Sequence, residues 1–347
     1  MAARRPTLIV TMGDPAGIGP EIVARALAVP ALRRTARLAV VGEPEVMARA
    51  ARRSRPLLRF RVMSPRDADL QADAPGIPLV ASSGEGWGAV RPGVATAASG
   101  RMAAKAIEAA AALALEGRAD GVVTAPISKA ALQSAGYPYP GHTEFFGALS
   151  RVPDTRMLFV GGDFRILLAS VHLPLRQVAD AVTAESLGRT LDFAAAALRN
   201  FRWGPRAAVA VLAMNPHAGE GGLFGDEEKR VIGPSIEAAR ARGIRVEGPY
   251  PADTFFAQHK NRRDLGIVVA MYHDQGLIPA KSGGIGGAAN VTLGLPFVRS
   301  SVDHGTAFDR AWKGGARAPD PAGLVTAIKV GAELAKRAMR PLEWTWP

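Results

Sequence analysis

Three histidines follow short apolar runs and begin glycine- or proline-containing loops, a position that suits metal binding. They are His172 in SVHLP, His217 in NPHAGEG and His273 in YHDQG. If their strands are neighbours in a parallel sheet, the strand ends bring three neutral imidazoles to one sheet edge. Three nitrogen ligands leave positions open for water or substrate, as in catalytic metal sites. The pattern predicts a divalent-metal site, although a single histidine at a strand end is more often a hydrogen-bonded structural residue.

Carboxylates stand beside the same kind of loop. They are Asp14, Asp253 in YPADTFF, Asp274 next to His273, and Asp303 next to His304. A neighbouring carboxylate can orient an imidazole or accept a proton, but aspartate is also a common turn residue. Both interpretations stay open for Asp253 and Asp274.

Two cationic residues flank a glycine-rich segment near the end of the chain. Lys281 and Arg299 are separated by SGGIGGAANV, in which Asn290 adds a neutral donor. Such a set could bind an anionic group such as a phosphate. For isolated residues of this kind, a solvated surface position is the usual alternative.

The composition indicates a globular protein with room for two domains. The chain has 347 residues, of which 48% are hydrophobic, and no cysteine. The lack of cysteine excludes disulfides and thiolate nucleophiles, so any metal ligands must be His, Asp or Glu. No apolar run approaches the roughly 18 to 20 residues of a membrane span, and the start MAARRPTLIVTMGD is too short for a secretory signal. We therefore expect no membrane partner and a cytoplasmic location.

The formal net charge of +12 raises the alternative of a nucleic-acid-binding protein. The basic residues are mostly arginines scattered over every segment, as in ALRRTARL, ARRSRPLLRF and EAARARGIR. No basic stripe is interleaved with aromatic residues, which favours solvated helix faces over binding of nucleic acid.

Short β-like runs alternate with longer helical ones. Strands are predicted at Leu8–Thr11, Leu38–Val41, Gly121–Ala125, Met157–Val160, Ile166–Val171, Ala208–Met214 and Gly266–Met271. Helices are predicted at Ala95–Leu115, Glu185–Phe201, Asp226–Arg242 and Pro321–Ala338, the third with a break or kink at Gly233-Pro234. This alternation predicts an α/β fold with a largely parallel sheet.

The segment TMGDPAGIGPEI, residues 11–22, has the strand, glycine loop and helix order of a phosphate-binding turn. Its glycines at 13, 17 and 19 do not have the G-x-G-x-x-G spacing of a dinucleotide fingerprint. Glu43 after the second strand leaves only a weak case for that fingerprint. We interpret the glycines as shaping a strand-to-helix turn, with Asp14 and Glu21 close by but unassigned.

Eight motifs occur in a specific order: GDPAGIGPE, TAPISK, GHTEFF, HLPL, NPHAGEGG, PADT, YHDQG and NVTLGLPFVRSSVDHGTA. Together they closely resemble the 4-hydroxythreonine-4-phosphate dehydrogenase family of vitamin B6 biosynthesis, from about residue 8 to 310. The first and last motifs also resemble segments of the isopropylmalate dehydrogenase fold, which binds NAD without a Rossmann loop.

This resemblance implies a two-domain α/β fold of the isocitrate/isopropylmalate dehydrogenase type, with an active-site cleft between the domains. The expected domains are residues 1–127 plus 300–347, contributing the NAD site, and residues 128–299, with the metal and substrate residues and the dimer interface.

The resemblance also assigns roles to residues. The metal ligands correspond to His172, His217 and His273, one of them supplied by the partner subunit of a homodimer. The substrate-binding residues correspond to His142, Thr143, Lys281, Asn290 and Arg299. Asp253 corresponds to a further active-site carboxylate, and Asp253 and Lys281 are the expected catalytic residues. The NAD site corresponds to Asp303, His304, Gly305, Thr306 and Ala307.

The implied reaction is the NAD- and metal-dependent oxidation and decarboxylation of 4-phosphooxy-L-threonine to 3-amino-2-oxopropyl phosphate. Zinc, magnesium or cobalt would serve as the divalent ion. The alternative is a related dehydrogenase that acts on phospho-threonate, phospho-erythronate or an aromatic cis-dihydrodiol carboxylate.

Two segments depart from the resembled pattern. After DHGTA, Arg310 and Trp312 replace a small apolar residue and a glycine, and the tryptophan could alter cofactor affinity. SGGIGGAA, between Lys281 and Asn290, lacks the aromatic or acidic residues often found there, and this loop lies between two expected substrate-binding residues.

Overall fold

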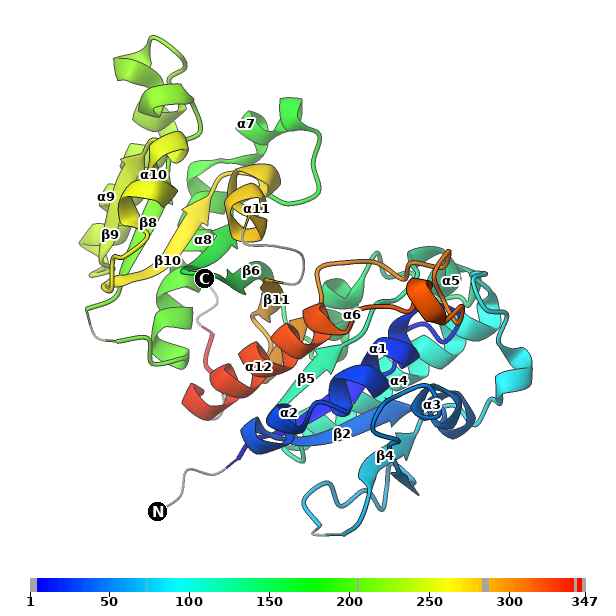
Figure 1. Cartoon of the computed structure of the whole chain (residues 1–347). Helices are drawn as coiled ribbons and strands as arrows, with labels where there is room; N and C mark the ends of the chain where they lie inside the picture. The colour runs from blue at the N-terminus through cyan, green and yellow to red at the C-terminus, as the bar shows by residue number, and fades with distance from the viewer. Residues whose placement is uncertain (1–4, 73, 205, 283–286, 340–341, 345–347) are drawn as a thin grey trace. The chain divides into compact units, whose positions relative to one another are not determined.

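The computed structural model describes residues 5–72, 74–204, 206–282, 287–339 and 342–344, and the chain divides into two compact units. Unit 1 comprises residues 1–155 and 295–336, and unit 2 comprises residues 156–294 and 337–347. In Figure 1, unit 1 carries the blue, cyan and orange-red segments and unit 2 the green and yellow ones. No helix in the described part of the chain combines the length and hydrophobicity of a membrane span.

Unit 1 is built on a parallel sheet. Its described strands lie in the order β3 (Phe60–Met63), β4 (Ile77–Ala81), β2 (Arg37–Gly42), β1 (Thr7–Thr11), β5 (Gly121–Thr124) and β12 (Val298–Ser301). Every residue of β1, β5 and β12 is buried. Near-continuous burial is typical of parallel strands covered by helices on both faces. The described α-helices of the unit are α1 (Gly19–Leu27), α2 (Pro30–Thr35), α3 (Pro44–Ala51), α4 (Ala97–Leu115), α5 (Lys129–Ser134), α6 (His142–Leu149) and α12 (Ala322–Arg337).

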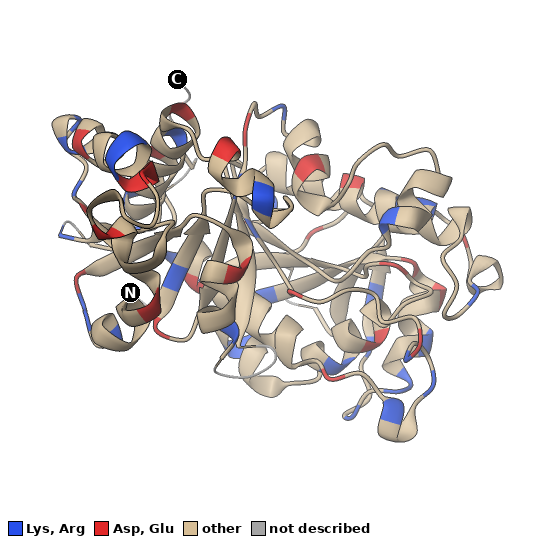
Figure 2. Cartoon of the chain, turned by 90° about the horizontal axis from the view of Figure 1, so that it is seen from above, with Lys and Arg blue, Asp and Glu red and all other residues tan. Residues whose placement is uncertain are grey.

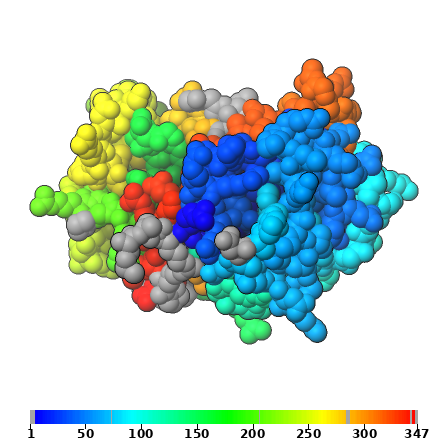
Figure 3. Space-filling model, turned by 60° about the horizontal axis from the view of Figure 1, so that its bottom comes forward, coloured from blue at the N-terminus to red at the C-terminus, as the bar shows by residue number. Residues whose placement is uncertain are grey.

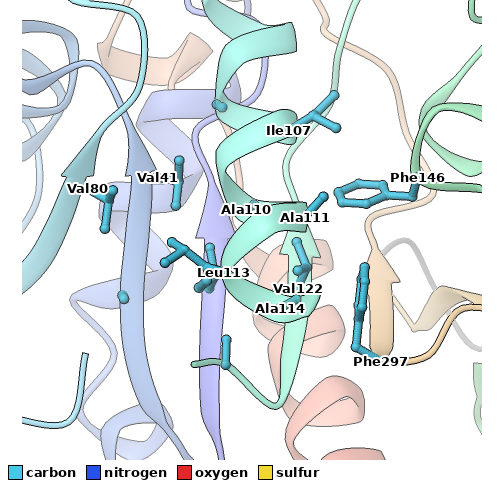
Figure 4. Packing of buried hydrophobic residues seen from close by; sticks show 14 of the residues in the cluster. Val41, Val80, Ile107, Ala110, Ala111, Leu113, Ala114, Val122, Phe146 and Phe297 are labelled. Atoms are coloured by element: carbon cyan, nitrogen blue, oxygen red, sulfur yellow. The ribbon is translucent and has the colours of Figure 1, made fainter. Parts of the chain in front are cut away.

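Helix α4 forms the centre of the unit 1 core. It begins at a capping box in which Thr96 and Ser99 exchange side-chain and backbone hydrogen bonds. Its small side chains let it approach its neighbours closely, and a Cβ on Gly100 would stand 2.0 Å from the Ala131 carbonyl oxygen of α5. Figure 4 shows this packing, in which Phe146 of α6 joins the same buried cluster. This core fixes α6, whose first residues are His142 and Thr143.

Unit 2 has a mixed sheet. Its described strands lie in the order β11 (Ala288–Leu293), β6 (Arg156–Gly161), β7 (Phe164–Leu168), β10 (Leu265–Ala270), β8 (Ala208–Leu212) and β9 (Val246–Tyr250). The pairs β11–β6 and β6–β7 are antiparallel, and the remaining pairs are parallel. The described α-helices are α7 (Val178–Ala181), α8 (Ala184–Asn200), α9 (Gly233–Ala241), α10 (Ala252–His259) and α11 (His273–Lys281).

The strand prediction on which the metal hypothesis depends is confirmed. The strands β7, β10 and β8 are parallel neighbours, so their carboxyl ends share one edge of the sheet. At Gly233, where a break or kink was predicted, the helix changes type: a π-helical turn, Glu228–Ile232, ends where α9 begins, and the backbone angles stay helical.

The boundaries between the units differ from the expected ones at 127/128 and 299/300. Residues 128–155 and 295–299 belong to unit 1, because α5 and α6 pack on α4 and β12 pairs with β5. Residues 337–347 belong to unit 2 rather than unit 1. There Asn200 donates to the Glu343 carbonyl at 2.7 Å and accepts from the Glu343 amide at 3.1 Å. Long-range pairing of this kind leaves no compositional mark in the chain.

Charged side chains of both signs are interspersed on the surface. Figure 2 shows lysines and arginines in blue and aspartates and glutamates in red, scattered together over helices and loops. Several are paired along a helix face, as Arg189 is with Glu185 at 2.8 Å. Such exposed pairs contribute little to stability but keep the positive charge dispersed.

Candidate active site

Two of the three predicted metal ligands lie next to each other in unit 2. His172 follows the end of β7, and His273 is the first residue of α11, directly after β10. Because these strands are adjacent, the two imidazole rings come to a centroid distance of 6.0 Å. Both residues are at least partly exposed, so neither ring is enclosed in the core.

His273 is oriented by its neighbour. Its Nδ1 lies 2.7 Å from Oδ1 of Asp274, which leaves Nε2 as the nitrogen able to bind a metal ion. Gln275 ties the same turn to the sheet, since it accepts from the Met271 amide and donates to the Ala213 carbonyl, each at 2.7 Å. The first turn of α11 is therefore held to the ends of both β10 and β8.

His217 lies on an unusual loop after β8. Five consecutive residues, 217–221, have φ between 42° and 77°, the left-handed region that side chains rarely adopt. The Glu228 carboxylate anchors the start of this loop by accepting from the amides of Met214 and Asn215, each at 2.8 Å. The ring centroids of His217 and Phe224 lie 6.2 Å apart.

The described residues of a single chain do not assemble all three histidines. No group of three or more His, Asp or Glu side chains within them is placed to hold a metal ion. Of the three histidines, His172 and His273 form a close pair of rings. The predicted metal set therefore remains a prediction.

Unit 1 contains a buried cationic group beside a helix start. Arg299 of β12 is 2% exposed, and its guanidinium donates to Oγ1 of Thr124 on β5 at 2.5 Å. Its Cζ lies 5.9 Å from the ring centroid of Phe146, and the His142 ring stacks on the same phenyl ring with centroids 6.4 Å apart. Thr143, also predicted to bind substrate, is 7% exposed at the start of α6. The structure thus brings Arg299, His142 and Thr143 into one neighbourhood.

The electrostatics of this neighbourhood favour an anion. Burial lowers the pKa of Arg299 to about 9, against the opposing effect of Glu144, so the guanidinium stays charged at neutral pH. Burial, followed by the charge of Arg299, lowers the pKa of His142 well below its usual value. His142 is therefore neutral, and its buried Nε2 has no hydrogen-bond partner among the described residues. A buried cation and an unused polar nitrogen mark a place for a ligand.

The other predicted substrate and catalytic residues lie in unit 2. Asn290 is on β11 opposite Phe159, and Lys281 is the last residue of α11. Asp253 lies in the first turn of α10, exposed to solvent. The glycine-rich departure between Lys281 and Asn290 falls partly on residues 283–286, outside the described part of the chain.

The predicted cofactor segment lies at the carboxyl edge of the unit 1 sheet. The strands β1, β5 and β12 are adjacent, so the loops that follow them meet there. The Asp14 amide donates to the Pro126 carbonyl at 2.8 Å, and the Ile18 amide donates to the Thr306 carbonyl at 2.9 Å. A Cβ on Gly17 would stand 2.9 Å from that carbonyl oxygen, whereas Gly305 faces open space. Loops at this edge are where open α/β sheets bind ligands.

Three residues that the sequence left unassigned are central to these loops. Asp14 is fully buried, and this burial raises the pKa of its carboxyl to about 6 despite hydrogen bonds from the Ala16 amide and the Ser99 hydroxyl. Glu21 and Trp312, 291 residues apart, are joined by a 2.6 Å hydrogen bond. The only sign of this contact in the sequence was that Trp312 replaces a glycine of the resembled pattern.

A pocket of about 600 Å³ lies elsewhere in unit 1, near the amino ends of its strands. It is lined by Arg5, Arg33, Arg37 and Arg59, among others, on the face that Figure 3 shows in blue. Arg33 donates to the Leu27 carbonyl, and Arg5 donates to the Arg33 carbonyl. None of the predicted site residues lines this pocket.

Comparison with known proteins decides the family. The family profile described as "Pyridoxal phosphate biosynthetic protein PdxA" matches residues 34–331. The chain belongs to the PdxA family. Among PdxA relatives it is 44% identical over 337 residues to the 4-hydroxythreonine-4-phosphate dehydrogenase of Geobacter metallireducens, covering 97% of each chain. It is 41% identical over 333 residues to the D-threonate 4-phosphate dehydrogenase of Pectobacterium atrosepticum, covering 94% of this chain and 99% of that one.

The fold agrees with that membership. The crystal structure of the 4-hydroxythreonine-4-phosphate dehydrogenase of Klebsiella pneumoniae matches with a TM-score of 0.85 at 40% identity, covering 95% of this chain and 99% of that one. The mixed α/β fold is thus that of PdxA. Because relatives with two different substrates in their names are almost equally similar, PdxA membership does not by itself identify the substrate.

Proposed function

We propose that this dehydrogenase of the PdxA family oxidises and decarboxylates 4-phosphooxy-L-threonine, giving 3-amino-2-oxopropyl phosphate for vitamin B6 biosynthesis. The substrate loses a hydride from C3, the proton of its C3 hydroxyl group, and its carboxyl group as CO2. The reaction uses NAD and a divalent metal ion. Dehydrogenases named for phosphorylated hydroxy acids among the relatives support this class of substrate.

The observation that carries the proposal is the buried Arg299 beside His142 at the start of α6. A guanidinium with 2% exposure is stabilised by an anionic ligand, and its planar donors match a phosphate well. The cap residue of α6, Gly141, offers no side-chain acceptor to the first amides of the helix, which also favour an anion. We assign the substrate phosphate to Arg299, His142 and Thr143, with Lys281 and Asn290 as further substrate-binding residues.

The histidines fit a divalent metal ion. The ring centroids of His172 and His273 lie 6.0 Å apart. Asp274 holds the ring of His273 in the orientation that ligation through Nε2 requires. We propose that these two residues and His217 of the partner subunit complete the site in a homodimer. When bound, the ion supplies Lewis acidity at the substrate oxygen, and NAD supplies the acceptor for hydride.

We propose that two residues of unit 2 transfer the protons of the reaction. Asp253, an exposed carboxylate, is proposed to accept the proton of the C3 hydroxyl group. Lys281, the last residue of α11, is proposed to return a proton to the carbon that loses CO2.

The NAD site is proposed at Asp303, His304, Gly305, Thr306 and Ala307. These residues follow β12 directly, and their loop is bonded to the glycine loop of residues 12–19 through the Ile18 amide. The exposed Gly305, with open space beside it, permits a close approach of a ligand to the backbone.

The second candidate is oxidation of D-threonate 4-phosphate, which carries a hydroxyl group where the first substrate carries an amine. A relative at 41% identity with that name supports it. Phospho-erythronate belongs to the same class. An aromatic cis-dihydrodiol carboxylate is less compatible with Arg299 and His142, because it has no phosphate to offer them.

A substrate panel tests the proposal. The protein is incubated with NAD, a divalent ion and each candidate, and NADH is followed by absorbance. Turnover of 4-phosphooxy-L-threonine well above that of the other acids supports the proposed substrate. Turnover confined to a phosphorylated sugar acid would replace it with the second candidate, and turnover of non-phosphorylated acids alone would refute the role of Arg299.

A further inference from the structure

The tryptophan at position 312 occupies a backbone conformation that favours glycine. Its φ is 61°, in the left-handed region, and its side chain is 8% exposed. A left-handed conformation costs a residue with a side chain about 1 to 2 kcal/mol unless the surroundings hold it. The contacts of Trp312 must therefore outweigh this cost.

Three hydrogen bonds fix the residue through both its backbone and its ring. The Trp312 amide donates to Oε2 of the buried Glu21 at 2.6 Å, and Nη1 of Arg53 donates to the Trp312 carbonyl at 2.7 Å. Arg53 and Glu21 are themselves paired at 3.2 Å. The indole Nε1 donates to the carbonyl of Pro15 at 2.9 Å. Backbone and side chain are thus both attached to the segment formed by the glycine loop and α1.

Aromatic and cationic contacts enclose the indole further. The Trp87 ring meets it edge to face with centroids 4.7 Å apart. The Arg53 guanidinium lies 5.6 Å from the Trp312 centroid, and that of Arg49 lies 4.4 Å from the Trp87 centroid. The indole is therefore packed inside unit 1 and does not face solvent.

Trp312 ends the segment that begins with the proposed NAD residues. The loop of residues 303–312 is therefore attached to the glycine loop at two places, at Thr306 through the Ile18 amide and at Trp312 through the Pro15 carbonyl. Trp312 is also bonded to Glu21 of α1. A loop fixed before binding loses less conformational entropy when the ligand arrives. We propose that Trp312 is a positioning residue that holds this loop in its binding conformation and so sets the affinity for NAD.

This inference rests on the proposed NAD site and is tested by binding and exchange rather than by turnover alone. Trp312→Phe keeps the ring but removes the donor to Pro15, and Trp312→Gly removes the whole side chain. We expect the NAD dissociation constant, measured by titration calorimetry, to rise about three- to tenfold in the first variant, the effect of one neutral hydrogen bond. We expect a larger rise of the dissociation constant in Trp312→Gly. In both variants, kcat should change less than the KM for NAD.

Hydrogen exchange measured by mass spectrometry without NAD provides a second readout. In Trp312→Gly, peptides covering residues 12–19 and 303–312 should lose protection together. Trp203→Phe in unit 2 is the matched control and should change neither NAD affinity nor exchange in these peptides. If Trp312→Gly fails to fold, Trp312→Phe still decides the question.

The outcomes separate the two proposals. Failure of the wild-type protein to bind NAD would refute the proposed cofactor. NAD binding by the wild type with an unchanged dissociation constant in Trp312→Phe and unchanged exchange in Trp312→Gly would refute the positioning role alone.

Discussion

Asp274 lies 2.7 Å from Nδ1 of His273 and fixes which nitrogen of that ring faces away from the carboxylate. The two residues are adjacent in the chain, and both lie in the first turn of α11. Orientation of a ligand histidine by a carboxylate is a common support of metal sites. The pair therefore gives the most direct test of the metal hypothesis.

We expect Asp274→Ala to weaken metal binding about 10- to 100-fold, because the His273 ring loses its fixed orientation. The affinity is measured by competition with a chromophoric chelator, using zinc or cobalt. Asp163→Asn, at an exposed aspartate of unit 2, serves as the control and should bind metal like the wild type. Equal affinities in Asp274→Ala and the control would contradict the assignment of His273 as a ligand.

Replacement of Arg299 should separate phosphorylated from other ligands. Arg299→Gln removes a buried cation that is proposed to bind the phosphate, so the KM for phosphorylated substrates should rise about 100-fold. Inorganic phosphate should raise the melting temperature of the wild type but not that of the variant. Arg91→Gln, at an exposed arginine of unit 1, should behave like the wild type in both measurements. An undiminished phosphate effect in Arg299→Gln would exclude Arg299 from the phosphate site.

The buried Asp14 should make stability depend on pH. Its pKa is raised from 3.8 to about 6 in the folded state, so the folded state holds the proton more tightly than the unfolded state. The stability linked to this proton is fully present below about pH 4 and is lost as the pH rises through 6, by up to about 3 kcal/mol.

Asp14→Asn keeps an acceptor for the Ala16 amide but has no such titration. The free energy of unfolding from urea titrations should therefore fall more steeply between pH 4 and 7 in the wild type than in the variant. Parallel pH profiles of the two proteins would show that Asp14 titrates normally.

Glycine should stabilise the loop that carries His217. Ala218 has φ of 54°, which an alanine adopts at a cost of about 1 to 2 kcal/mol. We expect Ala218→Gly to raise the free energy of unfolding by about 0.5 to 1 kcal/mol after the greater entropy of glycine in the unfolded chain is counted.

Ala238→Gly, in the right-handed helix α9, is the matched control and should lower the free energy of unfolding by about 1 kcal/mol. Changes of the same sign at both positions would contradict a left-handed loop at residues 217–221.

Local pattern predicted several of the strands whose residues are almost all buried. The strands β1, β5, β8 and β10 are apolar along their whole length or nearly so, and each coincides with a predicted strand. The strands β3, β4, β9 and β11 were not predicted. Most residues of β3 and β9 are only partly buried, and the apolar runs of β4 and β11 are short and contain Pro78 and Asn290. The segment of β12 was recognised only as part of a motif and not as a strand. Arg299 and two serines make its sequence polar, although all four residues are buried.

The site followed the same division. The sequence predicted that His172 and His273 follow neighbouring parallel strands. The pairing of β7 with β10 confirms this, and the two rings lie close together. The proximity of Arg299 and His142 depends on packing around Phe146, and the bond between Glu21 and Trp312 spans nearly the whole chain. Contacts between such distant segments depend on the complete fold, and no local pattern in the sequence predicts them.

The path of the chain through the two units has a consequence for synthesis. The strand β12 pairs with β5 in unit 1, yet residues 125–297, including nearly all of unit 2, are made between them. At about 5 to 20 residues per second, the ribosome needs on the order of ten to thirty seconds to cover that distance. During this interval the edge of β5 has no strand partner from β12, so the nascent chain exposes a template for misassembly. The last segments to emerge bring Arg299 and residues 303–307, so a prematurely terminated chain lacks both the proposed phosphate ligand and the proposed cofactor loop.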